Sequence, residues 1–250
     1  MKRLLCLFFV CTLHSVCAQI INIEDRRTSL KDSIGFGGSA DIGFSMLQNT
    51  RQILTGKVGV QLEFANKKHF LLAIGGYNAL QADGQKLSND GFAHLRYNYD
   101  LRTVWVGELF GQMQYNELLR IRRRTLGGAG VRLKLRPLLG QRVYLGASYL
   151  YEVNELSNGL TLRYHRMNNY LSFHLKLPRE SKFVSTTYYQ PVITHFANAR
   201  LATENTLQFK ITQKLSFRTT FSLVFDGDPM LPTEVPNTTY QITNALRWDF

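Results

Sequence analysis

The sequence predicts an all-β protein that crosses a membrane as an antiparallel, up-and-down transmembrane β-barrel of about twelve strands. Apolar and aromatic residues recur at alternate positions in many segments, so each strand has one face suited to lipid and one suited to a polar interior. Beyond residue 18, no stretch is apolar for the roughly 18 residues that a membrane helix needs. A content of 44% hydrophobic residues fits a barrel, because only one face of each strand meets lipid.

The start of the chain has the parts of a secretory signal peptide. Lys2 and Arg3 are basic, an apolar run follows them, and a small-residue site predicts cleavage after Ala18. The expected division of the chain is a signal peptide at 1–18, a short periplasmic N-terminal segment at 19–32 and an outer-membrane β-barrel domain at 33–250.

The three cysteines, Cys6, Cys11 and Cys17, all precede the predicted cleavage point. Disulfides, thiolate metal sites and cysteine nucleophiles are therefore not expected in the exported chain. A lipid anchor on Cys17 is disfavoured, because His14 and Val16 are poor residues before a lipidated cysteine.

Three segments show the alternation of a membrane strand most clearly, and polar or small residues separate their apolar positions. Their lipid-facing residues are Val58, Val60, Leu62 and Phe64 in the first, Val143, Leu145, Ala147, Tyr149, Tyr151 and Val153 in the second, and Leu215, Phe217, Phe221, Leu223 and Phe225 in the third. Elsewhere the register stays open. Residues 70–77 are apolar on both faces, residues 183–193 admit either phase, and a phase slip between Leu162 and Asn169 suggests a bulge or a longer loop.

Connections of two kinds alternate along the chain, as the short periplasmic turns and longer external loops of such barrels do. Tight polar turns are predicted near 66–68, 100–103, 137–141, 178–181 and 212–214, and longer loops at 81–90, 116–123, 154–167, 190–198 and 226–237. Four aromatic residues lie near the predicted periplasmic ends, where an aromatic girdle is expected: Tyr99, Trp105, Tyr144 and Trp248.

The last strand ends on an aromatic residue and resembles the C-terminal strand of bacterial outer-membrane barrels. Its lipid-facing residues are Tyr240, Ile242, Leu246, Trp248 and Phe250. This resemblance implies that the protein is exported to the outer membrane of a Gram-negative bacterium. It also implies that the barrel-assembly machinery is a partner through the strand ending at Phe250.

Four longer segments resemble one family in particular. They are Asp83–Tyr99, Gln114–Arg120, Arg124–Gly130 and Thr186–Pro191. They are similar to the salt-induced outer-membrane protein family, known as domain of unknown function 481. The resemblance implies the same fold and location, and a link to osmotic or salt conditions, but it implies no chemistry.

The chain is strongly basic, with a formal net charge of +12 that falls by two when Lys2 and Arg3 are removed. Nucleic acid is not an expected partner, because an exported barrel has no binding module for it. Outer-membrane lipid, lipopolysaccharide and small anions are the expected partners. Charges expected to face the lumen are Lys57, Arg96, Arg132, Lys134, Lys176, Lys210, Arg218 and Arg247, with Asp41, Glu63, Glu108, Glu152, Glu204 and Asp249.

These charges support two interpretations. A modest basic surplus in a barrel of about twelve strands fits a narrow pore for small solutes or anions. Alternatively, the charges pair across the interior and fill it, giving a structural or lipopolysaccharide-interacting barrel without conductance. A separate cluster, Arg120, Arg122, Arg123 and Arg124, lies in a predicted external loop, where it can bind lipopolysaccharide phosphates or remain solvated.

A lipid-modifying enzyme is the third function considered. The sequence has no G-x-S-x-G elbow and no H-E-x-x-H pair, and the histidines beyond residue 18 are scattered. Ser157, His165 and Asn168 are near one another in sequence, which is weak evidence for a catalytic triad. We therefore expect no catalysis, no cofactor and no metal; the oligomeric state is left open.

Overall fold

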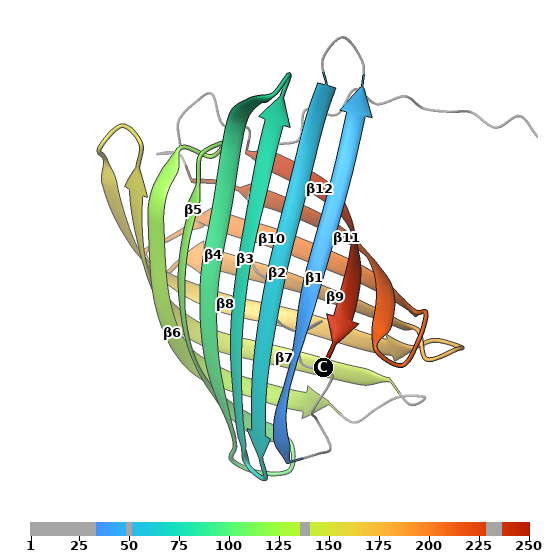
Figure 1. Ribbon diagram of the computed structural model, residues 1–250. Coiled ribbons are helices and arrows are strands. Elements are labelled where there is room, and N and C mark those ends of the chain that lie inside the picture. Colours follow the sequence, from blue (N-terminus) through green and yellow to red (C-terminus); the bar gives the residue numbers. More distant parts are fainter. Residues whose placement is uncertain (1–33, 49–51, 136–140, 229–236) are drawn as a thin grey trace, which may run out of the picture.

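The computed structural model describes residues 34–48, 52–135, 141–228 and 237–250, and the regular elements in these ranges are β-strands. The strands are β1 (Gly35–Gln48), β2 (Gln52–Asn66), β3 (His69–Ala82), β4 (Gln85–Asp100), β5 (Trp105–Asn116), β6 (Ile121–Leu135), β7 (Arg142–Leu156), β8 (Thr161–Lys176), β9 (Lys182–Val192), β10 (His195–Lys210), β11 (Leu215–Asp226) and β12 (Thr238–Asp249). Each strand pairs antiparallel with its neighbours in sequence, and β12 pairs with β1 to close the barrel (Figure 1). The predicted fold class is therefore confirmed. The predicted signal peptide and periplasmic segment lie outside the described residues.

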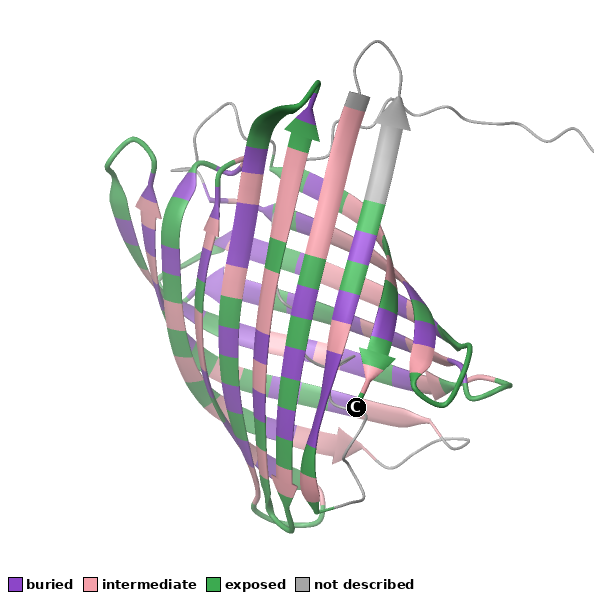
Figure 2. Ribbon diagram, viewed as in Figure 1, coloured by how far each residue is buried: buried purple, intermediate pink, exposed green. Residues whose placement is uncertain are grey.

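Burial alternates along the strands with a period of two (Figure 2). The apolar side chains predicted to face lipid are exposed on the outer wall, for example Val58 at 49% and Ile242 at 61%. Polar and charged side chains lie between them and are buried inside, for example Gln61 and Glu63. This inside-out distribution is that of a barrel whose outer solvent is lipid.

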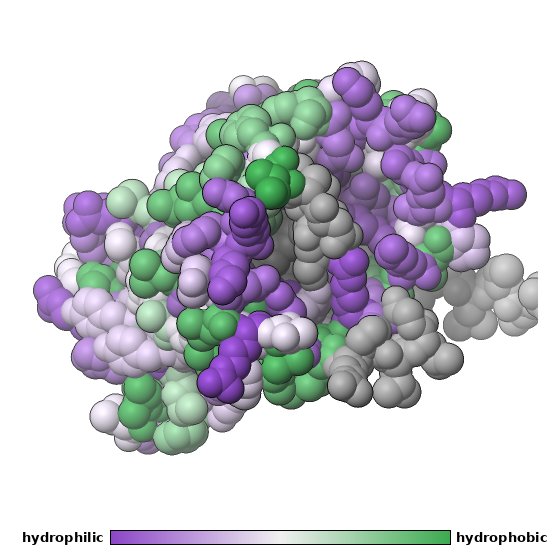
Figure 3. Space-filling view, turned by 90° about the horizontal axis from the view of Figure 1, so that it is seen from below, coloured by the Kyte–Doolittle hydropathy of each residue, from purple (hydrophilic) through white to green (hydrophobic). Residues whose placement is uncertain are grey.

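The end of the barrel at which β1 begins and β12 ends is called the terminal end here. Its turns 67–68, 101–104, 177–181 and 211–214 match four of the predicted tight turns, and most of the fifth lies outside the described residues. Seen from this end, hydrophilic side chains are numerous around the barrel rim (Figure 3).

At the opposite end, called the far end, the predicted long loops are mostly wrong. β3 continues to Ala82 and β4 starts at Gln85, so only Asp83 and Gly84 remain between them, with φ of 49° and 78°. Positive φ at both positions is the two-residue hairpin turn that Asp-Gly favours. Short turns at 117–120, 157–160 and 193–194 likewise replace three other loops, whereas most of 226–237 lies outside the described residues. The strands there pair through their backbones, although both of their faces carry polar residues and the alternation is lost.

Three segments had an ambiguous register in the sequence, and the side chains that face the barrel interior now define it. Leu72 and Ile74 of β3 point inward, as do Val184 and Tyr188 of β9. The bulge suggested between Leu162 and Asn169 is wrong, since β8 pairs with β7 without interruption from Thr161 to His174. The apparent slip arises because inward-facing Leu162 packs against Leu119, Ile121 and Leu156, an apolar cluster inside the far end.

The prediction of an aromatic girdle is correct for only some of the residues assigned to it. Trp105 and Trp248 are exposed on the outer wall, at 42% and 50%. Tyr144 is 3% exposed and faces inward, and its ring makes a T-shaped contact with that of His174. Its place near a strand end suggested the girdle, but its position in the alternation of β7 puts it on the inner face.

Candidate functional site

The barrel interior holds the densest set of charged side chains in the described part of the chain. Seven arginines and seven carboxylates are buried there. They are Arg96, Arg124, Arg132, Arg166, Arg200, Arg218 and Arg247, with Asp41, Glu63, Asp90, Glu108, Glu152, Asp226 and Asp228. Because an unpaired buried charge is costly, this balance indicates that the charges are arranged in pairs.

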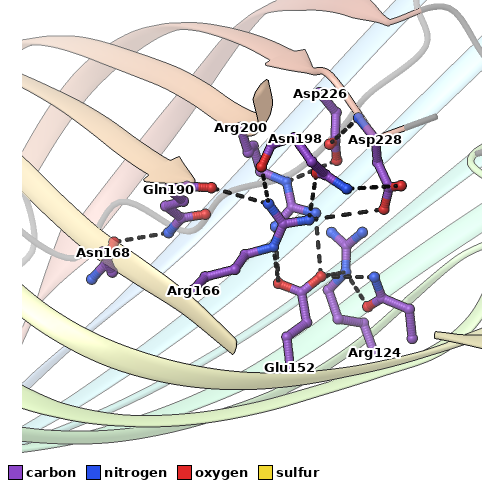
Figure 4. Close-up of polar contacts among 10 residues, drawn as sticks. Arg124, Glu152, Arg166, Asn168, Gln190, Asn198, Arg200, Asp226 and Asp228 are labelled. Atoms are coloured by element: carbon purple, nitrogen blue, oxygen red, sulfur yellow. Dashed lines mark hydrogen bonds and ion pairs between the residues drawn. The ribbon is translucent and has the colours of Figure 1, made fainter. Parts of the chain in front are cut away.

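Glu152 of β7 is the centre of one group, called the Glu152 cluster (Figure 4). Its carboxylate accepts hydrogen bonds from both terminal nitrogens of Arg200 on β10, at 3.1 and 3.3 Å. Arg124 Nε lies 3.5 Å from Oε1, and Arg166 Nε lies 3.8 Å from Oε2. Three guanidinium groups thus surround one carboxylate that is 0% exposed.

Two further carboxylates complete the cluster. Asp226, at the end of β11, accepts a hydrogen bond of 2.8 Å from Arg200 Nε. Asp228 Oδ2 lies 3.8 Å from Arg166 Nη2, and Asp228 Oδ1 accepts a hydrogen bond of 3.3 Å from Asn198. Three arginines therefore face three carboxylates, and the cluster is neutral as a whole.

Arg166 is held by the backbone as well as by charges. Its Nη1 donates to the carbonyl oxygens of Gln190, at 3.0 Å, and Asn198, at 3.4 Å. Its guanidinium also lies 4.7 Å from the centre of the Tyr164 ring. These fixed partners make it a rigid part of the wall.

A second group, the Glu108 cluster, lies nearer the terminal end. Glu108 of β5 accepts a hydrogen bond of 3.0 Å from Arg96 on β4, and Arg132 of β6 lies 3.9 Å from its other oxygen. The hydroxyl of Tyr170, on β8, donates to Glu108 Oε2 at 2.9 Å. The ring of Tyr170 occupies the space where a side chain of Gly146, its cross-strand partner, would lie. The missing side chain lets Tyr170 reach across two strands.

Both clusters connect strands that are not neighbours. Glu152 and Arg200 are on β7 and β10, and Glu108 and Tyr170 are on β5 and β8, so each contact passes over the two strands between. Such contacts run through the lumen and not along the wall.

Residues of both clusters line a small cavity. Its volume is about 40 Å³, and its lining includes Arg96, Gln112, Arg124, Tyr188 and Arg200. A space of this size and polarity holds a few waters at most, since one water needs roughly 10–15 Å³. Side chains therefore leave little open space in this part of the interior.

The charged residues expected in the lumen fall into two groups. Buried inside are Arg96, Arg132, Arg218, Arg247, Asp41, Glu63, Glu108 and Glu152. Less buried, or at a strand end, are Lys57, Lys134, Lys176, Lys210, Glu204 and Asp249. Glu63 bonds with Gln61, Arg218 lies 3.6 Å from Asp41, Lys134 lies 2.8 Å from Asp100, and Lys210 lies 2.6 Å from Glu180.

The predicted lipopolysaccharide rim needs one correction. Arg124 is 5% exposed, lies inside the barrel and donates a hydrogen bond of 2.7 Å to Asn154. The loop expected around it is in fact β6, whose alternation turns this residue inward. Arg122 and Arg123 remain exposed at the far end, and both bond the carboxylate of Glu155. Arg120 lies in the preceding turn with φ of 56°.

Four members of the Glu152 cluster were not predicted: Arg166, Arg200, Asp226 and Asp228. Arg166 and both aspartates lie in or beside segments read as loops. The signal that could have identified Arg166 is its parity with Asn168, which places both on the inner face of β8.

The possible triad is not assembled. His165 lies on the outer wall against the Tyr149 hydroxyl, at 2.6 Å, whereas Asn168 is buried inside and bonds Ser148. Ser157 donates to the carbonyl of Arg120 in the far-end turns. Among the described residues, no group of three or more His, Cys, Asp or Glu side chains could hold a metal ion.

Comparison with known proteins agrees with this geometry. The fold is similar to that of the KdgM porin, with a TM-score of 0.52 and 11% identity, covering 85% of this chain and 99% of that one. The NanC porin has a TM-score of 0.48 and 10% identity, covering 84% of this chain and 97% of that one. No curated protein matches the sequence significantly. The model of the family described as "Protein of unknown function, DUF481" matches residues 40–248, so the chain belongs to this family, as its motifs predicted.

Proposed function

We propose that the protein is an outer-membrane barrel that passes small solutes through a narrow polar lumen, with an envelope role linked to osmotic conditions. The observation that carries this proposal is the pair of charge clusters that cross the lumen and leave a cavity of only about 40 Å³ between them. The porin-type fold supports a pore, and the two clusters limit its bore. Large solutes are excluded by the same side chains.

The selectivity of this pore follows from where charge is uncompensated. The buried arginines and carboxylates are equal in number, so the centre of the lumen favours neither sign. At the terminal end, Lys176 adds positive charge near the opening, whereas Lys134 and Lys210 are paired with Asp100 and Glu180. We therefore propose a small conductance with a weak anion preference.

Planar-bilayer recording of the refolded protein tests the pore. We expect small steps in the wild type and larger steps in the double variant Glu152→Gln/Arg200→Gln, which removes the contact across the lumen without changing net charge. The control is Lys86→Gln/Glu117→Gln, which removes an exposed pair at the far end, 3.3 Å apart. Silence from all three folded proteins refutes the pore and favours a filled, structural barrel. A clearly cationic selectivity refutes the anion preference.

We propose a second interaction at the far end, with the phosphates of lipopolysaccharide. The side chains of Arg122 and Arg123 are 71% and 55% exposed, and guanidinium groups bind phosphate through paired hydrogen bonds. Replacement of Arg120, Arg122 and Arg123 by glutamine is expected to lower lipopolysaccharide retention during purification. Arg102→Gln/Arg179→Gln at the terminal end is the control, and equal retention in both variants removes the proposal.

The closing strand supports the proposed assembly route. Phe250 is 57% exposed, and it exchanges backbone hydrogen bonds of 3.1 and 3.0 Å with Gly38 of β1. We propose that the barrel-assembly machinery recognises this strand before it pairs with β1. Deletion of Phe250 is expected to lower outer-membrane levels of the protein in cells, while refolding in detergent continues.

A further inference from the structure

The seam between β1 and β12 is closed over only part of its length. Paired residues run from Ser39 to Ile42 on β1 and from Asp249 to Leu246 on β12, and Gly38 and Phe250 extend this pairing by one position. After Ile42, β1 still pairs with β2, and before Leu246, β12 still pairs with β11. These two parts of β1 and β12 do not pair with each other. The seam is therefore open toward the far end.

The two strands come close at the edge of this opening. A side chain on Gly43 would meet the backbone oxygen of Asn244 at 2.9 Å and the Cβ of Ala245 at 3.8 Å. In a continued register, Gly43 would pair with Ala245, yet that pair is absent. The strands thus pass each other at Gly43 and then separate.

A cavity of about 260 Å³ lies at the opening. Its inner lining is polar and includes Lys57 of β2, Asn78 of β3 and Asp90 of β4. Its lining also includes Phe44, Tyr240 and Ile242, whose side chains are 71%, 40% and 61% exposed on the outer wall. Inward-facing Gln241 and Thr243 line it as well, so both faces of β12 border the same space. The cavity therefore joins the barrel interior to the lipid-facing surface.

We propose that this opening, called the lateral site, binds a zwitterionic phospholipid of the phosphatidylethanolamine type. A cationic and an anionic side chain, Lys57 and Asp90, line its inner part, and Asn78 donates a hydrogen bond of 2.7 Å to Asp90. A headgroup with one phosphate and one ammonium complements both charges. A lipid whose headgroup is only anionic complements Lys57 but offers no cation to Asp90.

The size of the lateral site agrees with partial entry of the lipid. Sites that enclose a drug-sized ligand measure roughly 300–1,000 Å³, so 260 Å³ accepts a headgroup and not a whole lipid. The acyl chains must stay outside, where Phe44, Tyr240 and Ile242 present apolar surface toward the bilayer. The lateral site is also separate from the proposed pore constriction, since neither Glu108 nor Glu152 lines it.

Native mass spectrometry of the folded protein, titrated with phosphatidylethanolamine or phosphatidylglycerol, tests the headgroup assignment. We expect preferential binding of phosphatidylethanolamine, weakened about tenfold by Asp90→Asn and by Lys57→Gln, each of which removes one charged contact. Lys134→Gln, an inward-facing lysine outside the lateral site, is the control and is expected to bind as the wild type does. Equal binding of both lipids, or unchanged binding in both variants, overturns the assignment.

A disulfide across the seam tests the lateral route. The three cysteines of the chain all lie at or before position 17, so a pair introduced into the exported protein has no competing thiol. Phe44→Cys/Asn244→Cys lies at the first unpaired outward positions past Gly43, so its disulfide draws the two strands together and is expected, once oxidised, to lower phosphatidylethanolamine binding. Ala40→Cys/Trp248→Cys lies in the paired part and is the control. All variants are first shown to be folded by heat-dependent gel mobility. If the oxidised Phe44/Asn244 pair binds as its reduced form does, the lipid does not enter through the seam.

Discussion

The replacement Glu152→Gln is the sharpest test of the ion-paired interior. Glu152 is fully buried, and its carboxylate is shared by Arg200, Arg124 and Arg166 at 3.1 to 3.8 Å. The amide keeps the shape of the side chain but removes the charge, so three buried guanidinium groups face only two remaining carboxylates. Removing one partner of a buried ion pair costs about 3–5 kcal/mol.

This cost is measurable by urea unfolding of the barrel in detergent micelles or lipid. With a slope of about 3 kcal/mol per molar urea, the unfolding midpoint is expected to fall by about 1 M or more. The fluorescence of Trp105 and Trp248, both on the outer wall, reports the transition. The matched control is Glu117→Gln, whose partner Lys86 is 54% exposed, and it is expected to cost less than about 1 kcal/mol.

A second substitution separates charge balance from a general packing defect. Glu152→Gln/Arg124→Gln restores equal numbers of buried positive and negative groups, so it is expected to recover part of the lost stability. If Glu152→Gln unfolds within about 1 kcal/mol of the wild type, the network does not hold the interior as described. If the double variant is instead less stable than Glu152→Gln by about a further 3–5 kcal/mol, charge balance is not the reason for the pairing.

Two further predictions concern the terminal half of the barrel. Gly146→Ala places a methyl group where the ring of Tyr170 lies, so it is expected to destabilise the barrel in urea, whereas Gly56→Ala, which meets nothing within 4 Å, is expected to be neutral or slightly stabilising. Equal effects contradict the close approach at Gly146. A hydrogen bond from Lys210 lowers the pKa of Glu180, so this contact stabilises the fold above the ordinary pKa of a glutamate and is lost as pH falls through the lowered value. Titration by NMR is expected to show this pKa rising toward its ordinary value in Lys210→Met, and an unchanged pKa contradicts the contact.

Much of the fold followed from alternation alone, because lipid imposes it on every strand that it touches. The outward positions of Val58 and Phe217 and the inward positions of Glu108 and Arg132 were all correct for this reason. At the far end the strands no longer alternate between apolar and polar faces. Parts of real strands were therefore predicted as loops, and the inward position of Arg166 was missed for this reason.

The partners inside the lumen were less predictable for a different reason. Alternation assigns a face to each residue but says nothing of what lies opposite. The contact between Glu108 and Tyr170 depends on the absence of a side chain at Gly146, and that between Glu152 and Arg200 depends on the barrel's cross-section. Such contacts require the closed barrel and cannot be read from any one strand.

The uneven distribution of contacts across the lumen has a mechanical consequence. The two clusters connect strands in the part of the wall from β4 to β11 through side-chain contacts, which stiffen that part. The arc from β12 to β3 contributes to neither cluster, and it contains the half-open seam. We therefore expect a sideways force on the barrel to deform that arc first, where Arg218 and Asp41 are 3.6 Å apart across β12. The side held by the two clusters is expected to keep its shape while the opposite side changes.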